Sequence, residues 1–178
     1  FSGITNIIDA LGGVEVDSPY EFTTLHGNYK IKKGVNELNG DQALCFVRER
    51  YALPSGDFDR GKNQQRLLKA MLKKAMSPKI ITNYSNILAA VEGSFETDMS
   101  SDDIKSLVNM QLDDMANWEM FNVQVTGDGA ISYDTYSQKG KKTYITIPYK
   151  KSIQNIRKVI DKIEAGKKLT EADVKGLS

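Results

Sequence analysis

The hydrophobic positions of this chain follow two different spacings, which predict helices and strands in alternation. Several segments carry apolar side chains every three or four residues, the period of one helix face: residues 4–11, 57–76, 80–91, 104–115 and 153–163. Shorter segments have the alternation or composition of strands: residues 14–17, 22–24, 29–32, 118–125 and 143–147. A short helix is expected from Asn39 to about Cys45. This alternation predicts an α/β fold.

The number of predicted strands limits this interpretation. They are too few to form a complete sheet that is covered by helices on both faces. The chain also opens with Phe1, already inside a helical pattern. We therefore expect residues 1–178 to belong to a larger domain whose first half lies outside this chain. Residues 166–178 begin with Gly166, which is expected to end the last helix, and this lysine-rich tail is expected to be frayed.

Composition limits the kinds of functional site that the chain can form. The chain has 178 residues and a formal net charge of +1, so any anion site must be local. Its single cysteine, Cys45, excludes an intramolecular disulfide, and its apolar neighbours favour a thiol packed in the core. Its single histidine, His26, lies in a polar turn, which argues against Ser-His-Asp or Cys-His hydrolysis. The sequence contains no run of about 20 apolar residues, so it predicts no transmembrane helix.

Two arginines follow a run of apolar residues, two positions apart. If residues 46–50 are extended, Arg48 and Arg50 lie on the same face and present two guanidinium groups to one ligand. Arginine binds phosphate oxygens through two parallel hydrogen bonds, which favours a phosphate-containing ligand.

The next helix is expected to begin at Asp57 or Asp59 and run to about Met76. Counting back from Leu67 and Leu68 by helical steps reaches Gln64 and then Arg60, so we expect these polar groups to continue the core-facing stripe. Together with the two earlier arginines they predict a cavity for an anion at a helix start. The alternative is a buried Arg–Asp pair that only holds the loop.

These segments resemble the signature of the LytR-CpsA-Psr family. The resemblance rests on Leu38-Asn39-Gly40-Asp41-Gln42-Ala43-Leu44, Phe46-Val47-Arg48-Glu49-Arg50, Asp57-Phe58-Asp59-Arg60 and Gln64-Gln65, with Gly12-Gly13-Val14-Glu15-Val16 and Lys33-Gly34 before them. Asn63 departs from the pattern, because many members carry a basic residue there. The resemblance implies an α/β/α sandwich with a central mixed sheet, of which residues 1–178 are the C-terminal portion.

The resemblance also implies a function. Members of the family are membrane-anchored, extracytoplasmic enzymes of Gram-positive bacteria that transfer anionic glycopolymers, such as capsule or teichoic acid, from polyprenyl pyrophosphate to peptidoglycan. It assigns pyrophosphate contacts to Arg48, Arg50, Arg60 and Gln64, with Asp57 as the acidic residue beside Arg60. Arg60 and Asp57 are the candidate catalytic residues. The family uses Mg²⁺, whose ligands we expect before Phe1 because no matching carboxylate pair is visible here.

Two alternatives remain open at this stage. A non-catalytic polyprenyl-phosphate binding module would use the same arginines. A transcription regulator is the other, but the near-neutral charge and the lack of a helix-turn-helix with a basic recognition helix argue against nucleic acid as a partner.

Overall fold

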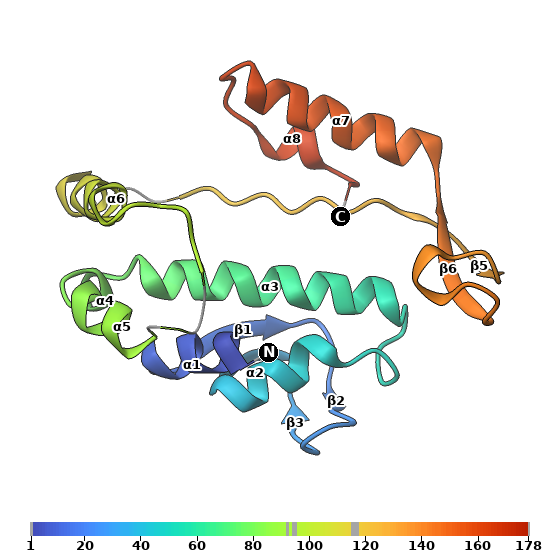
Figure 1. Cartoon of the computed structure of the whole chain (residues 1–178), viewed down its shortest axis with the longest axis horizontal. Coiled ribbons are helices and arrows are strands. Elements are labelled where there is room, and N and C mark those ends of the chain that lie inside the picture. Colours follow the sequence, from blue (N-terminus) through green and yellow to red (C-terminus); the bar gives the residue numbers. More distant parts are fainter. Residues whose placement is uncertain (1, 92, 94–95, 115–117, 178) are drawn as a thin grey trace. The chain divides into compact units, whose positions relative to one another are not determined.

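The computed structural model describes residues 2–91, 93, 96–114 and 118–177. They form two compact units, one up to Trp118 and one from Glu119 onward (Figure 1). The predicted α/β class is confirmed by the mixture of helices and strands. The prediction that residues 1–178 are part of one catalytic domain stays a prediction.

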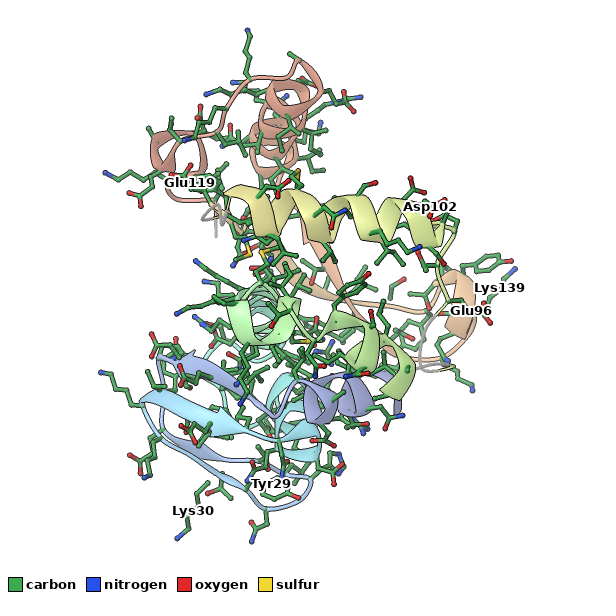
Figure 2. The ribbon with its side chains drawn as sticks, turned by 90° about the vertical axis from the view of Figure 1, so that its left-hand side faces the viewer. Tyr29, Lys30, Glu96, Asp102, Glu119 and Lys139 are labelled. Carbon is green, nitrogen blue, oxygen red and sulfur yellow. The ribbon has the colours of Figure 1, made fainter. Side chains whose placement is uncertain are left out.

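The first unit begins with helix α1 (Ser2–Ala10) and strand β1 (Val14–Ser18). Gly12 and Gly13 have φ of 74° and 84°. This left-handed conformation suits glycine, and it turns the chain between α1 and β1. The short strands β2 (Phe22–Thr23) and β3 (Lys30–Ile31) form a hairpin, and Figure 2 shows Lys30 pointing away from its outer edge.

Strand β4 (Gly34–Leu38) was not predicted from the sequence. It pairs antiparallel with β1, with Val14 opposite Leu38 and Ser18 opposite Gly34. Helix α2 (Gly40–Arg48) follows and begins with a capping box, in which Asn39 and Gln42 bond reciprocally. The Gly40 N–H donates to Asp9 of α1 at 2.7 Å, and a side chain at Gly40 would collide with the Thr5 carbonyl. The two helices therefore pack closely because residue 40 is glycine.

Helix α3 (Asp57–Ala75) packs along β1 and against α2, and it is longer than every other helix in the described part of the chain. Its Leu67 joins Ile8, Val14, Val16 and Phe46 in the core. The predicted helix over residues 80–91 is two short helices, α4 (Pro78–Ile81) and α5 (Tyr84–Ala90). Both lie at the C-terminal end of α3 (Figure 1). Helix α6 (Ser101–Asp114) completes the described first unit.

The second unit contains strand β5 (Gly127–Ser132), the 3₁₀ turn η1 (Tyr136–Gln138), strand β6 (Thr143–Pro148) and helix α7 (Lys150–Glu164). The predicted strand over residues 118–125 is wrong, because these residues are neither helix nor strand in the structure. The strand instead starts at Gly127. Glycine fits there because a side chain at Gly127 would collide with the Ile147 carbonyl of β6.

The C-terminal residues are more ordered than the sequence suggests. Helix α8 (Glu171–Val174) begins with a capping box between Thr170 and Asp173. The Leu177 carbonyl accepts a hydrogen bond from the Gln124 N–H at 2.8 Å, and Lys162 of α7 lies 2.6 Å from Asp173. The described residues after Gly166 therefore fold back on their own unit, and the expected frayed tail is not observed there.

Sheet topology differs from the central mixed sheet that we expected. Within the described residues the pairings are β1–β4, β2–β3 and β5–β6, each antiparallel and two-stranded. That the first half of the domain lies outside this chain stays a prediction. In the described part of the chain, no helix is long and apolar enough to cross a membrane.

Candidate functional site

The segment with the two arginines is not a strand. Arg48 is the last residue of α2, and the chain becomes extended only at Glu49, with φ −65° and ψ 136°. Helix α2 therefore runs three residues further than predicted, since nothing between Cys45 and Arg48 breaks it. Arg48 and Arg50 are both exposed, on either side of buried Glu49. That they present their guanidinium groups to one ligand stays a prediction.

Glu49 is the acidic residue that the sequence reasoning overlooked. Its side chain is only 3% exposed and accepts backbone N–H bonds from Leu25, Tyr51, Arg50 and Ala52 at 2.6 to 3.0 Å. Burial opposes the charge, but these four hydrogen bonds outweigh it and hold the pKa of Glu49 below its usual value. The carboxylate is therefore ionised and fully engaged by the backbone.

The loop between α2 and α3 is fixed at both ends and in its middle. Glu49 holds its start, and Leu53 is buried in the core. At its end, the buried Asp59 carboxylate accepts the Ser55 N–H at 2.8 Å. The α3 start has no side-chain cap, because Asp59 bonds back to the loop and Gly56 occupies the cap position. The predicted helix start at Asp57 is thus correct.

This loop brings Arg50 close to the start of α3. The Arg50 guanidinium donates from Nη2 to the Tyr51 hydroxyl at 2.6 Å and lies 4.6 Å from the centre of that ring. The tyrosine and, to a smaller extent, Asp57 raise the pKa of Arg50 above its usual value. Asp57 also forms an ion pair with Arg60, with Nη2 and Oδ1 2.8 Å apart. Asp57 therefore contacts Arg60 directly, and its charge also acts on Arg50.

The orientation of α3 differs from our prediction by one residue. The buried side chains of its first half are Asp59, Asn63 and Leu67, whereas Arg60 is partly exposed and Gln64 is exposed. Aspartate and asparagine are polar, so a hydropathy pattern assigns Asp59 and Asn63 to the solvent-facing side although they are buried. The sequence pattern therefore misassigned the core-facing side of α3. Asn63 accepts from Arg66 through Oδ1 at 2.9 Å, and its Nδ2 has no partner in the described structure.

The face that carries Arg60 and Gln64 continues into an apolar groove. Leu68 is 57% exposed and Leu72 is 37% exposed. Both line an open groove of about 390 Å³, whose walls come from α1, α3, α4, α5 and α6. The lining side chains are Ile7, Leu11, Leu68, Met71, Leu72, Ala75, Ile80, Ile81, Tyr84, Ile87, Leu88, Val91, Ile104 and Val108. One face of α3 thus has charged and polar groups at its N-terminal end and a groove at its other end.

The carboxylates around the arginines do not fit a magnesium site. Glu49 and Asp59 are buried and bonded to backbone N–H groups, and Asp57 is paired with Arg60. Among the described residues, no group of three or more histidine, cysteine, aspartate or glutamate side chains is placed to hold a metal ion. The expectation of magnesium ligands before Phe1 stays a prediction.

Comparison with known proteins identifies the family. The model of the LytR_cpsA_psr family matches residues 1–166, and the chain belongs to the LytR-CpsA-Psr family. One relative from Bacillus cereus, named polyisoprenyl-teichoic acid–peptidoglycan teichoic acid transferase TagU, is 35% identical over 127 residues. The match covers 71% of this chain and 41% of that protein, so the matched part is less than half of the relative.

Solved structures have the same fold. TagV of B. subtilis matches with a TM-score of 0.71 at 22% identity, covering 94% of this chain and 62% of that one. Protein gbs0355 from Streptococcus agalactiae matches with a TM-score of 0.68 at 27% identity, covering 96% of this chain and 56% of that one.

Proposed function

We propose that this protein is a phosphotransferase that moves an anionic glycopolymer, such as capsular polysaccharide or teichoic acid, from polyprenyl pyrophosphate to peptidoglycan. The observation that carries the proposal is the exposed face of α3. Arg60 and Gln64 lie in its N-terminal half, and Leu68 and Leu72 line the groove further along. The rise of a helix separates Arg60 from Leu72 by about 18 Å. A charged end and an apolar end on one surface suit a ligand with an anionic head and a hydrocarbon tail.

The arginines supply the electrostatic part of the reaction. An acceptor sugar hydroxyl forms a bond to the phosphorus that carries the glycopolymer, and the bridging P–O bond of the pyrophosphate breaks. Its electron pair leaves with polyprenyl phosphate, and the hydroxyl proton passes to water. Charge accumulates on the leaving phosphate, where the guanidinium groups of Arg48, Arg50 and Arg60 neutralise it. Asp57 orients Arg60 through their ion pair.

Three further features belong to this proposal. Magnesium would neutralise additional pyrophosphate charge, with its ligands supplied by a preceding portion of the same domain. That portion would also cover apolar side chains of the second unit that are exposed in this chain, such as Ile131 and Ile147. The protein would act on the extracytoplasmic face of the membrane of a Gram-positive bacterium, anchored by a segment outside this chain. The transferase name of the Bacillus relative supports the reaction class.

A non-catalytic polyprenyl-phosphate binding module is the second candidate. It is favoured by the state of the carboxylates near the arginines, because Glu49 and Asp59 are buried and Asp57 is ion-paired. None of these described groups is poised to accept the acceptor proton. A binding module needs the arginines and the groove but no base.

Release of polyprenyl phosphate from a short lipid-linked saccharide distinguishes the transferase from the binding module. The assay contains the chain with the preceding portion of its domain restored, Mg²⁺ and peptidoglycan fragments. The transferase produces polyprenyl phosphate and modified peptidoglycan in equal amounts. Tight lipid binding without release would overturn the transferase and support the binding module.

A further inference from the structure

Glu49 lies between the two arginines in the sequence, but its side chain points into the protein. Arg48 and Arg50 are exposed, whereas Glu49 is 3% exposed. Its Oε1 atom accepts three consecutive backbone N–H groups, from Arg50 at 3.0 Å, Tyr51 at 2.8 Å and Ala52 at 3.0 Å. Three consecutive donors on one oxygen fix the direction of the backbone after α2.

The second carboxylate oxygen ties this turn to another part of the first unit. Glu49 Oε2 accepts the Leu25 N–H at 2.6 Å, from the connection between β2 and β3. The Thr24 hydroxyl holds the same connection by donating to the His26 carbonyl at 2.6 Å. The turn that carries Arg50 is therefore anchored to a segment 24 residues earlier, and not only to its neighbours.

Tyr51 connects the fixed turn to the guanidinium group of Arg50. Its N–H is held by Glu49, while its hydroxyl accepts from Arg50 at 2.6 Å and its ring lies 4.6 Å from the guanidinium carbon. The Tyr51 side chain is itself 71% exposed, so its contact with Arg50 is not needed to fill the core. An exposed arginine is ordinarily mobile, and a ring that it stacks on restricts its rotamers.

We propose that Glu49 and Tyr51 are positioning residues, which hold the Arg50 guanidinium in its place before an anion binds. The nature of that anion, a pyrophosphate group, rests on the function proposed above, whereas the positioning itself does not. Such preorganisation saves the cost of ordering a long side chain when the ligand arrives. The buried carboxylate is costly to desolvate, and its four backbone donors offset that cost.

The first experiment needs no ligand. The Arg Nε–H signals are followed by NMR in the full chain, with the wild type compared with Glu49→Gln and Tyr51→Phe. Glutamine keeps the volume of Glu49 but replaces one acceptor oxygen by a donor, and phenylalanine keeps the ring but removes the hydroxyl. Both variants should shift the Arg50 signal and speed its exchange with water, while Arg157 of α7 stays unchanged. An unchanged Arg50 signal in both variants would overturn the proposal.

The second experiment measures inorganic pyrophosphate binding by calorimetry at a temperature where every variant is folded. Glu49→Gln should weaken binding about tenfold, the equivalent of one hydrogen bond to a charged group. In an Arg50→Ala background the same change should have little further effect, because Glu49 acts through Arg50. Leu67→Ala, a destabilised control with an intact site, should bind normally. Equal losses in both backgrounds would show a purely structural role and overturn the proposal.

The two experiments separate this inference from the proposed function. A wild-type chain that fails to bind pyrophosphate would contradict the function. If its Arg50 signal still responds to Glu49→Gln and Tyr51→Phe, the positioning role stands. Tyr51→Phe also keeps the test decisive if Glu49→Gln does not fold, because the Tyr51 side chain is exposed.

Discussion

The Nη2 atom of Arg60 lies 2.8 Å from the Oδ1 atom of Asp57, one turn earlier on α3. Both side chains are more than a third exposed, so this pair contributes little to stability. Its geometry instead sets the direction of the Arg60 guanidinium. The carboxylate of Asp57 is engaged by this contact, which favours an orienting role for Asp57 over proton transfer.

Replacing Arg60 by alanine should lower turnover much more than lipid affinity, because its charge matters most in the transition state. The expected loss is on the order of 3 kcal/mol, or about a hundredfold in rate. The measurement is release of polyprenyl phosphate under single-turnover conditions. Asp57→Asn, which retains an acceptor for Arg60, should lose less activity. A larger loss in Asp57→Asn than in Arg60→Ala would instead make Asp57 the base.

Arg48→Ala and Arg50→Ala should weaken pyrophosphate-lipid binding without unfolding the protein. Both arginines are exposed, and surface substitutions usually change the free energy of unfolding by less than about 0.5 kcal/mol. Binding is followed with a fluorescent lipid pyrophosphate, and stability by urea denaturation. Unfolding of the double variant would show that the arginines only hold the loop.

Adjacent leucines on α3 should separate stability from ligand binding. Leu67 is 1% exposed in the core, so Leu67→Ala should cost about 2–5 kcal/mol of unfolding free energy. Leu68 is 57% exposed and lines the groove, so Leu68→Ser should cost much less but weaken binding of the lipid tail. Urea denaturation and competition between long-chain and short-chain lipid phosphates test the pair. If Leu68→Ser leaves long-chain binding unchanged, the groove does not hold the tail.

The second unit should respond to acid through Asp173. The Lys162 ammonium and then the Thr170 hydroxyl and N–H hold the pKa of the Asp173 carboxyl down at about 2, below its ordinary 3.8. A lowered pKa in the folded state stabilises the fold fully above pH 3.8, and this contribution disappears as the pH falls from 3.8 through about 2. Asp173→Asn should therefore be less stable than the wild type at pH 7. The difference, measured by urea denaturation at each pH, should shrink in acid.

Cys45 should react slowly with alkylating reagents at pH 8. Burial, followed by the charge of Asp41, raises the pKa of its thiol above 9.0, despite the opposing effect of Arg48. Few thiolates are then present at that pH. Iodoacetamide labelling, followed by mass spectrometry, should be much faster in urea than in the folded chain. Equal rates in both states would mean that the thiol is accessible and ordinary.

Local patterns were sufficient to predict much of the fold. Helical periodicity placed α1, α3, α6 and α7, because each carries apolar residues at helical spacing. Strand β4 was missed, since Val35 is exposed and its pairing with β1 depends on residues about 20 positions away. The place of Gly127 in β5 was missed for a similar reason. Only its partner strand shows that glycine serves close approach there.

The candidate site residues could be named from the sequence, but their geometry could not. The arginines and Asp57 could be found from sequence, whereas the buried carboxylates Glu49 and Asp59 could not. A charged residue between two arginines is expected to be exposed, and its burial depends on the distant Leu25 N–H. One signal was available: if Arg48 and Arg50 share a face, the residue between them faces the opposite way.

The length of α3 gives the proposed site a fixed scale. The helix is a single rod from Asp57 to Ala75, with the loop of Arg50 at one end and α4 and α5 at the other (Figure 1). A rigid rod works as a ruler between a ligand's charged head and its tail. A tail too short to cover the roughly 12 Å from Arg60 to Leu68 gains nothing from the groove. Affinity should therefore rise in a step once the hydrocarbon reaches Leu68, and not gradually with each added carbon.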